Sequence, residues 1–276
     1  MSFQPDLDAY FARIGYAGPR NPTLEVLNAI AAAHVQSIPF ENLDVLLGRP
    51  IRLEPAAIFQ KLVLDRRGGY CFEQNGLLLE ILSAMGFQTS PLSARVRWQR
   101  PRDFTPPRTH VFLRTTFNGE DWLIDVGVGA LSLTSAIRLD ESGHVQATPH
   151  EPRRIVREES RLFHQVLLGE QWCDLYEFTL EEMPLIDREL GNWYTSAHPE
   201  SKFRNRLIVA RAAPEGVRLT LQNDEFSMRG RDGRADTQRL TTPAELLEVL
   251  ATHFGLHFPA GTRFMTEAAV RLVDTA

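Results

Sequence analysis

The fold of this chain is read most directly from Arg67-Gly68-Gly69-Tyr70-Cys71-Phe72-Glu73-Gln74-Asn75, which predicts the start of a helix. Gly68 and Gly69 disfavour a helix because glycine loses the most backbone entropy there. After Cys71, Gly86 stands where a C-terminal glycine cap belongs, and apolar residues recur at helical spacing: Leu77, Leu78, Ile81, Leu82 and Met85. We therefore expect Cys71 at or just before the first turn of this helix, where the helix dipole favours a thiolate. The alternative is a buried, inert cysteine.

The composition is that of a soluble globular protein. The 276 residues suffice for one large domain or two to three small ones, with 43% hydrophobic and 24% charged residues. A net charge of −5 argues against a general nucleic-acid binder. The two cysteines, Cys71 and Cys173, form neither a metal-binding spacing nor a disulfide framework. With no basic signal peptide and no long apolar run, we expect a cytoplasmic protein without metal, membrane or nucleic-acid partner.

The periodicity of the chain changes twice. Residues 24–35 and the segment from about Pro55 to the glycine pair predict helices, and Glu41 and Asn42 between them predict caps or buried polar anchors. Alternating patterns then predict strands near 92–98, 155–157, 163–168 and 172–178. We expect residues 179–206 to be irregular or briefly helical. Short strands at 207–211, 217–221 and 225–229 and an amphipathic helix at 243–254 complete the prediction.

Asn118-Gly119 predicts a two-residue hairpin turn between strands at 110–117 and 122–127. In that hairpin Phe117 faces Glu120, and Asp125 becomes the diagonal neighbour of His110, with Cα atoms ~7–8 Å apart. A carboxylate at that place can orient the imidazole and stabilise its charged form. The alternative is a solvated pair on an ordinary hairpin. The apolar neighbours of Asp125 argue against it, because a buried carboxylate needs a partner.

Cys71, His110 and Asp125 are residues of the kinds that act as nucleophile, base and orienting acid in a catalytic triad. Sequence spacing does not place Cys71 against His110. The residues alone therefore predict acyl transfer through a thioester, with the acceptor unspecified.

Four motifs in the same order resemble the arylamine N-acetyltransferases: residues 38–43, 67–75, 109–110 and 125–129. The resemblance continues to Pro199-Glu200-Ser201-Lys202-Phe203. It implies an α+β multidomain fold with a cysteine-protease-like Cys-His-Asp core. The expected domains are a helical bundle at 1–87 carrying the cysteine, a β-barrel at 88–196 carrying His and Asp, and an α/β lid at 197–276.

The resemblance also implies ping-pong transfer of acetyl from acetyl-CoA to arylamines and arylhydrazines, with Cys71, His110 and Asp125 as catalytic residues. The residues expected to bind acetyl-CoA or the amine are Phe40, Arg67, Tyr70, Phe72, Thr109, Gly127, Val128 and Gly129. A common form of the family motif has Phe at the position of Val128, which puts the acceptor range in doubt. The sequence does not indicate the oligomeric state.

Alternatives stay open at this point. A thiol hydrolase or transglutaminase-like acyltransferase would use the same three residues, a CoA-dependent synthase would make a different aromatic amide, and a binding module would need no reactive thiol. A cluster of arginines also predicts a basic rim that attracts the phosphates of acetyl-CoA. It consists of Arg95, Arg97, Arg100, Arg102 and Arg108. The alternative for these arginines is a solvated strand face.

Overall fold

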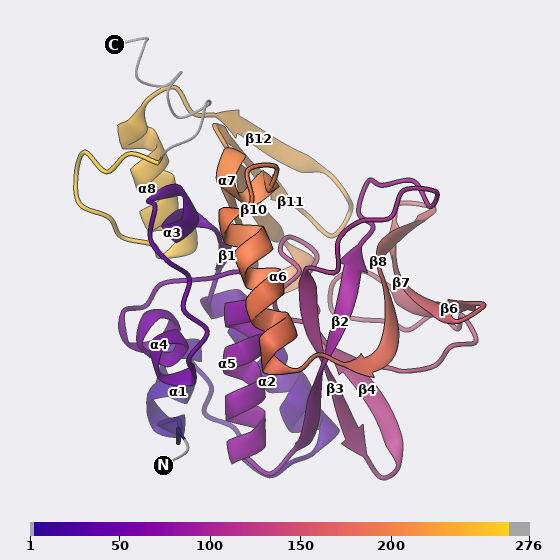
Figure 1. Ribbon diagram of the computed structural model, residues 1–276. Coiled ribbons are helices and arrows are strands. Elements are labelled where there is room, and N and C mark those ends of the chain that lie inside the picture. Colours follow the sequence, from indigo (N-terminus) through magenta and orange to yellow (C-terminus); the bar gives the residue numbers. More distant parts are fainter. Residues whose placement is uncertain (1–2, 265–276) are drawn as a thin grey trace.

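The computed structural model describes residues 3–264, so 265–276, the end of the expected lid, lie outside the described residues. It contains an N-terminal group of helices, a seven-stranded sheet and a five-stranded sheet (Figure 1). This arrangement is the predicted α+β multidomain fold. The domain boundaries after residues 87 and 196 stay a prediction. Within the described residues, no helix combines the length and hydropathy needed to cross a membrane.

The N-terminal helices surround the segment that carries Cys71. They are α1 (Leu7–Ile14), α2 (Leu24–Ser37), α3 (Leu43–Leu46), α4 (Pro55–Phe59), the π-helix η1 (Gln60–Leu64) and α5 (Cys71–Ala84). The start of α5 at Cys71 confirms the prediction from the glycine pair. Helix α2 begins after Thr23, whose side chain accepts the Val26 N–H as an N-cap.

The seven-stranded sheet forms a nearly closed barrel in the order β5-β4-β3-β2-β8-β7-β6. Its strands are β2 (Gln88–Val96), β3 (His110–Phe117), β4 (Glu120–Ile124), β5 (Ile137–Arg138), β6 (Arg153–Glu158), β7 (Arg161–Leu168) and β8 (Gln171–Glu182). In the β3–β4 hairpin, Phe117 faces Glu120 and Leu113 faces Ile124, which confirms the predicted register. Single bridges such as Gln146 with Arg153 connect the segment after β5 to β6, at the other edge.

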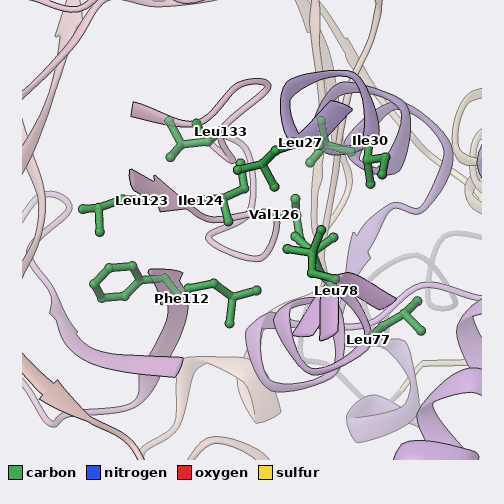
Figure 2. Close-up of a cluster of buried hydrophobic side chains, with 14 of the residues drawn as sticks. Leu27, Ile30, Leu77, Leu78, Phe112, Leu123, Ile124, Val126 and Leu133 are labelled. Carbon is green, nitrogen blue, oxygen red and sulfur yellow. The ribbon is translucent and has the colours of Figure 1, made fainter. Parts of the chain in front are cut away.

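One hydrophobic core joins the helices to the barrel (Figure 2). Leu78 of α5 and Leu27 of α2 belong to the same buried cluster as Phe112 and Ile124 of the hairpin. Burying such side chains contributes ~1.5–3 kcal/mol each, so this shared core fixes α5 against β3. Cys71 and His110 lie on those two elements.

The five-stranded sheet has the order β1-β9-β10-β11-β12 and is covered by α8 (Pro243–Phe254). Its strands are β1 (Phe40–Glu41), β9 (Ile208–Ala212), β10 (Arg218–Gln222), β11 (Glu225–Arg229) and β12 (Ala235–Arg239). The short helices α7 (Lys202–Asn205) and η2 (Pro214–Gly216) flank β9. Because β1 comes from the N-terminal region and pairs with β9, this sheet contains strands from both ends of the chain.

Helix α6 (Leu185–Ala197), orange in Figure 1, corrects the expectation that residues 179–206 are irregular or briefly helical. Its larger apolar side chains, among them Ile186, Leu190 and Trp193, face solvent. It meets the start of α5 through Gly191, where an added Cβ would lie 2.7 Å from Cζ of Phe72. A glycine at this contact lets the two helices approach closely.

Candidate active site

Cys71 occupies the first position of α5 and is 5% exposed. The backbone before it is tightly packed. A Cβ on Gly68 would lie 2.2 Å from the carbonyl oxygen of Pro39, and one on Gly69 would lie 2.6 Å from Oε2 of Glu73. The glycine pair therefore ends the preceding segment and also makes room for the chain to enter the helix at the cysteine.

His110 and Asp125 form the predicted pair. The His110 Nε2 donates to Asp125 Oδ2 at 2.7 Å, and both side chains are buried. The β3–β4 ladder ends at Leu113 and Ile124, so Asp125 lies just beyond the last paired residue of β4. The predicted contact is confirmed, although other groups and not the ladder hold the carboxylate.

Asn75 supplies part of that support, and sequence reasoning did not assign it a role. Its Nδ2 donates to Asp125 Oδ1 at 3.0 Å and to the Val111 carbonyl at 2.7 Å, and its Oδ1 accepts the Val126 N–H at 3.1 Å. The Gly127 N–H also donates to Asp125 Oδ1, at 3.0 Å. Helical spacing could have identified Asn75 from the sequence, since a residue four places after Cys71 lies on the same face of the helix.

The charges of the pair support each other. Burial opposes the charged ring, but the Asp125 carboxylate and hydrogen bonds to Asp125 and Cys71 outweigh it and raise the pKa of His110 to about 10. Burial also opposes the charge of Asp125, yet the imidazolium and the donors around it lower the pKa of this carboxyl. Because Nε2 is hydrogen-bonded to Asp125, Nδ1 is the ring nitrogen left to form the hydrogen bond with Cys71. The site therefore holds a charged imidazole beside a thiol.

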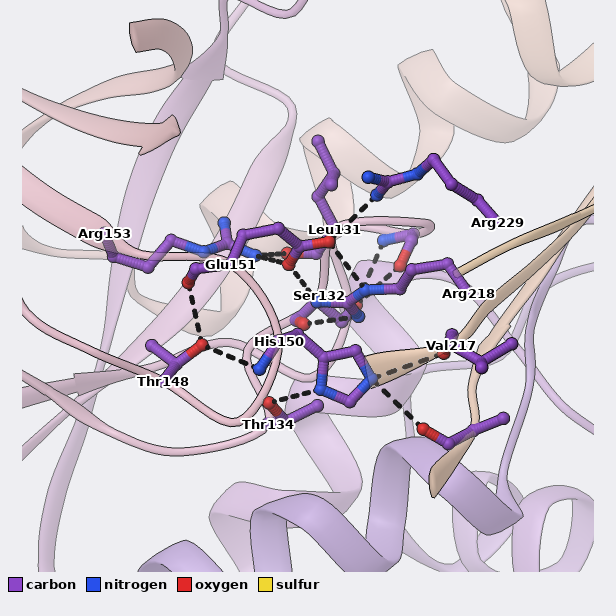
Figure 3. A network of polar contacts seen from close by, with 12 residues as sticks. Leu131, Ser132, Thr134, Thr148, His150, Glu151, Arg153, Val217, Arg218 and Arg229 are labelled. Atoms are coloured by element: carbon purple, nitrogen blue, oxygen red, sulfur yellow. Dashed lines mark hydrogen bonds and ion pairs between the residues drawn. The ribbon is translucent and has the colours of Figure 1, made fainter. Parts of the chain in front are cut away.

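The loop after Asp125 is fixed from the far side by a buried charge network (Figure 3). The Asp125 carbonyl accepts the Leu133 N–H at 2.7 Å. The carbonyl of Leu131 accepts from Arg153 Nη2, and the carbonyl of Ser132 accepts from Arg218 Nη1, each at 2.9 Å. Since Arg218 belongs to β10, the C-terminal sheet helps to hold the loop that follows Asp125.

A cavity of about 340 Å³ opens onto Cys71 and His110. Its lining includes four of the eight residues expected to bind substrate, namely Phe40, Thr109, Gly127 and Val128. Its other lining residues are Val96, Trp98, Arg100, Phe104, Pro106, Pro107, Tyr194, Thr195, Glu200, Ser201, Lys202 and Phe203. The aromatic part of this lining suits a flat apolar molecule.

The other four expected binding residues, Arg67, Tyr70, Phe72 and Gly129, are not among the residues that line the cavity. Arg67 is paired with Glu41 at 2.7 Å and with Asp44 at 3.2 Å, so its guanidinium is already engaged away from the cavity. Tyr70 donates its hydroxyl to Asn192. Gly127, which does line the cavity, packs tightly against the start of α5, since a Cβ on it would lie 2.7 Å from the Cys71 Cα. A glycine at this position therefore allows the two backbone segments to approach closely.

The five arginines considered for a basic rim do not form a free basic surface, because four of them are engaged by other groups. Arg97 is buried against Glu177 at 2.7 Å, and Arg102 pairs with Asp174 at 2.6 Å. Arg95 donates to the Pro106 carbonyl and Arg108 to Glu181. Strand β8 supplies Glu177, Asp174 and Glu181, and the loop between β2 and β3 supplies the Pro106 carbonyl. The β8 partners lie far away in the sequence, so the sequence of the loop alone does not identify them. Of the five arginines, Arg100 alone is among the cavity-lining residues given above.

Phe203 is a cavity wall to which sequence reasoning gave no role, although its motif was part of the resemblance. Its ring centroid lies 6.1 Å from that of Phe40 and 5.7 Å from that of Tyr70. Asn42 fixes this segment, because its Nδ2 donates to the carbonyls of Phe203 and Arg206 at 2.6 and 2.7 Å. The Asn42 Oδ1 accepts the Ile208 N–H at 2.9 Å. Asn42 is therefore a buried polar anchor, which is one of the two roles predicted for it.

A thiol at a helix start, a buried imidazole and a carboxylate beside an apolar cavity define a thiol-dependent acyl-transfer enzyme. Within residues 3–264, no group of three or more His, Cys, Asp or Glu side chains could hold a metal ion. The family model described as N-acetyltransferase matches residues 23–262. The chain belongs to the arylamine N-acetyltransferase family.

Relatives and solved structures agree with this assignment. The arylamine N-acetyltransferase of Mycolicibacterium smegmatis is 44% identical, over 91% of this chain and 92% of the relative. The structure of the enzyme from M. tuberculosis is 41% identical with a TM-score of 0.87, covering 91% of this chain and 93% of that one. The Mycobacterium marinum enzyme, solved in complex with CoA, is 38% identical with a TM-score of 0.86, covering 91% and 92%.

Proposed function

We propose that this protein transfers acetyl from acetyl-CoA to arylamines by a ping-pong mechanism through an acetyl-Cys71 intermediate. The observation that carries the proposal is the juxtaposition of Cys71, charged His110 and buried Asp125 at the cavity. The family assignment supports acetyl-CoA as the donor and an arylamine as the acceptor.

In the first half-reaction the Cys71 thiolate attacks the thioester carbonyl of acetyl-CoA. The N–H of Cys71, at the first position of α5, has no carbonyl one turn earlier in the helix and can donate to the tetrahedral oxygen. Collapse of the intermediate breaks the bond to CoA, and His110 gives the leaving thiolate a proton. One thioester replaces another, so the acetyl group stays activated.

In the second half-reaction the nitrogen of the acceptor attacks acetyl-Cys71, and His110 takes the proton that the nitrogen loses. An arylamine is largely unprotonated at neutral pH, whereas an alkylamine is mostly a cation. Arylhydrazines have a similarly available nitrogen and belong to the proposed acceptors. Phe40, Val128 and Phe203 contribute apolar walls for the ring.

We assign direct substrate contact to Phe40, Thr109, Gly127 and Val128, which line the cavity. Arg67, Tyr70, Phe72 and Gly129 act from behind by holding the segments that carry the lining residues. Val128 lines the cavity at the position where a common form of the family motif has Phe, so we propose that this side chain influences the choice of acceptor.

Mass spectrometry of protein treated with acetyl-CoA tests the proposal. We expect a single acetyl adduct on Cys71, lost on adding an arylamine with formation of the acetylated amine. The Cys71→Ser variant should form no such adduct, whereas Cys173→Ser, which changes the half-buried second cysteine, should behave as wild type. An adduct lost equally fast in buffer without amine would identify a hydrolase, and no adduct at all would contradict the proposal.

A further inference from the structure

The carboxylate of Asp125 can accept one more hydrogen bond than its neighbours supply. Its Oδ1 accepts from Asn75 and from the Gly127 N–H, each at 3.0 Å. Its Oδ2 accepts only from His110 among the described residues, although a carboxylate oxygen can accept two hydrogen bonds. Because Asp125 is completely buried, a fourth donor to this carboxylate comes from the protein interior.

Tyr176 of β8 lies against the His110–Asp125 pair. Its side chain is completely buried, and its ring centroid is 5.2 Å from that of His110. Burial raises the pKa of Tyr176 most, and the charge of Asp125 and hydrogen bonding to it raise this pKa further, so the hydroxyl lies near the carboxylate. The described residues nevertheless offer the hydroxyl no partner with the distance and angle of a direct hydrogen bond.

Two further buried side chains extend this polar row across neighbouring strands. His164 of β7 is directly opposite Tyr176, and the two rings meet edge to face with centroids 4.8 Å apart. Arg153 of β6 is opposite Val166, which makes it the diagonal neighbour of His164 on the same sheet face. Both ring nitrogens of His164, and Nε and Nη1 of Arg153, have no hydrogen-bond partner among the described residues. With the Tyr176 hydroxyl, five such atoms form a buried row that ends at Asp125.

The partner of these atoms has to donate as well as accept hydrogen bonds. Burial, and then the charge of Arg153, lower the pKa of His164 well below its usual value, so its neutral ring has one donor and one acceptor nitrogen. A chloride ion would only accept, and it would bring a second negative charge close to Asp125. Water does both, and buried polar groups without protein partners are commonly satisfied by ordered internal water.

We propose that Tyr176 is a positioning residue for the His110–Asp125 pair, and that a buried water molecule shared with His164 links its hydroxyl to Asp125 Oδ2. The ring of Tyr176 supports the imidazole, and the water gives the carboxylate its fourth hydrogen bond. This inference rests on the proposed roles of His110 and Asp125. Tyr176 is not among the residues that line the cavity, so it acts through Asp125 and not by contact with substrate.

The test is the proton NMR resonance of the His110 Nε2–H, which reports on the hydrogen bond from this group to Asp125. Tyr176→Phe keeps the ring and removes the hydroxyl, and His164→Leu removes the second partner of the water at similar side-chain volume. Tyr10→Phe is the matched control. Tyr10 is also completely buried, and its hydroxyl lies 2.8 Å from Nδ1 of another buried histidine, His34.

We expect Tyr176→Phe and His164→Leu to move this resonance downfield, because a carboxylate that loses one hydrogen bond becomes a stronger acceptor for those that remain. Tyr176→Phe should lower the acetylation rate at saturating acetyl-CoA by ~fivefold, the usual effect of one hydrogen bond, and leave the KM for acetyl-CoA unchanged. Tyr10→Phe should lower the melting temperature but leave the resonance and the rate at their wild-type values.

An unchanged or upfield resonance in either Tyr176→Phe or His164→Leu would overturn the inference, so one folded variant suffices for the test. An equal shift in Tyr10→Phe would also overturn it, because the shift would then be a general response to the loss of a buried hydroxyl. The resonance is recorded without substrate. A wild-type protein that acetyl-CoA never acetylates on Cys71 would therefore count against the proposed function and leave the expected shifts unaffected.

Discussion

Replacing Glu151 with glutamine should destabilise the protein by ~3 kcal/mol at neutral pH. Glu151 is the one carboxylate in the network that holds the loop after Asp125 (Figure 3). It accepts from Arg153 at 3.1 Å, from Arg218 at 2.6 Å and from Arg229 at 2.9 Å. Arg153 and Arg218 are almost completely buried, so a neutral residue 151 leaves two guanidinium groups without a counter-charge.

The expected magnitude follows from two routes. Burial alone would raise the pKa of Glu151, but the arginines, Arg218 first, lower it from 4.5 to about 2. A shift of that size is worth ~3 kcal/mol at ~1.4 kcal/mol for each unit. Removing one partner of a buried ion pair typically costs ~3–5 kcal/mol. The two values agree.

Urea denaturation of wild type and Glu151→Gln at several pH values is the assay. Because the folded-state pKa is lowered, the contribution of Glu151 is present above about 4.5 and is lost as the pH falls toward about 2. The difference between the two proteins should therefore be largest near neutral pH and narrow in acid. Glu170→Gln, an exposed turn residue, is the control. A loss below ~1 kcal/mol, or one independent of pH, would refute this reasoning.

Three further outcomes are expected. Asp125→Asn should lower the acetylation rate of Cys71 by ~10³-fold or more and should also lower the melting temperature, because the amide misorients His110. A wild-type rate in stopped-flow kinetics together with a wild-type melting temperature in calorimetry would contradict this. Arg100→Gln should raise the KM for acetyl-CoA by ~threefold, as should added salt in the wild type, with little change in the KM for the amine. The raised pKa of His110 stabilises the fold below about 6.5, and this contribution should disappear as the pH rises through about 10; His110→Gln should lack the alkaline loss in a pH series of melts.

The sequence predicted features that depend on local signals. The start of α5 at Cys71 followed from two glycines and a helical period, and the contact between His110 and Asp125 followed from the Asn118-Gly119 turn. Helix α6 was missed because its apolar residues face solvent and it contains Gly191, a poor helix former. Strand β12 has only exposed residues and therefore no alternation to detect.

Buried charges were the other limit. A single sequence does not distinguish a solvated arginine from one such as Arg97, whose partner Glu177 is 80 residues away. The same holds for Arg218 and Glu151, and for Lys61 and Glu73. Helical spacing could have suggested Asn75 as a neighbour of Cys71, but its three hydrogen-bond partners, Val111, Val126 and Asp125, become visible only in three dimensions.

Asn42 has a consequence for biosynthesis. Its hydrogen-bond partners lie 161 to 166 residues further along the chain, at Phe203, Arg206 and Ile208. The segment around Phe203 forms one wall of the cavity. During translation, Cys71, His110 and Asp125 are all made before this segment. A nascent chain stopped between residues 125 and 203 would contain all three side chains but lack Phe203 and the rest of this cavity wall. Cys71, His110 and Asp125 are thus made early in synthesis, whereas the segment that closes this side of the cavity is made late.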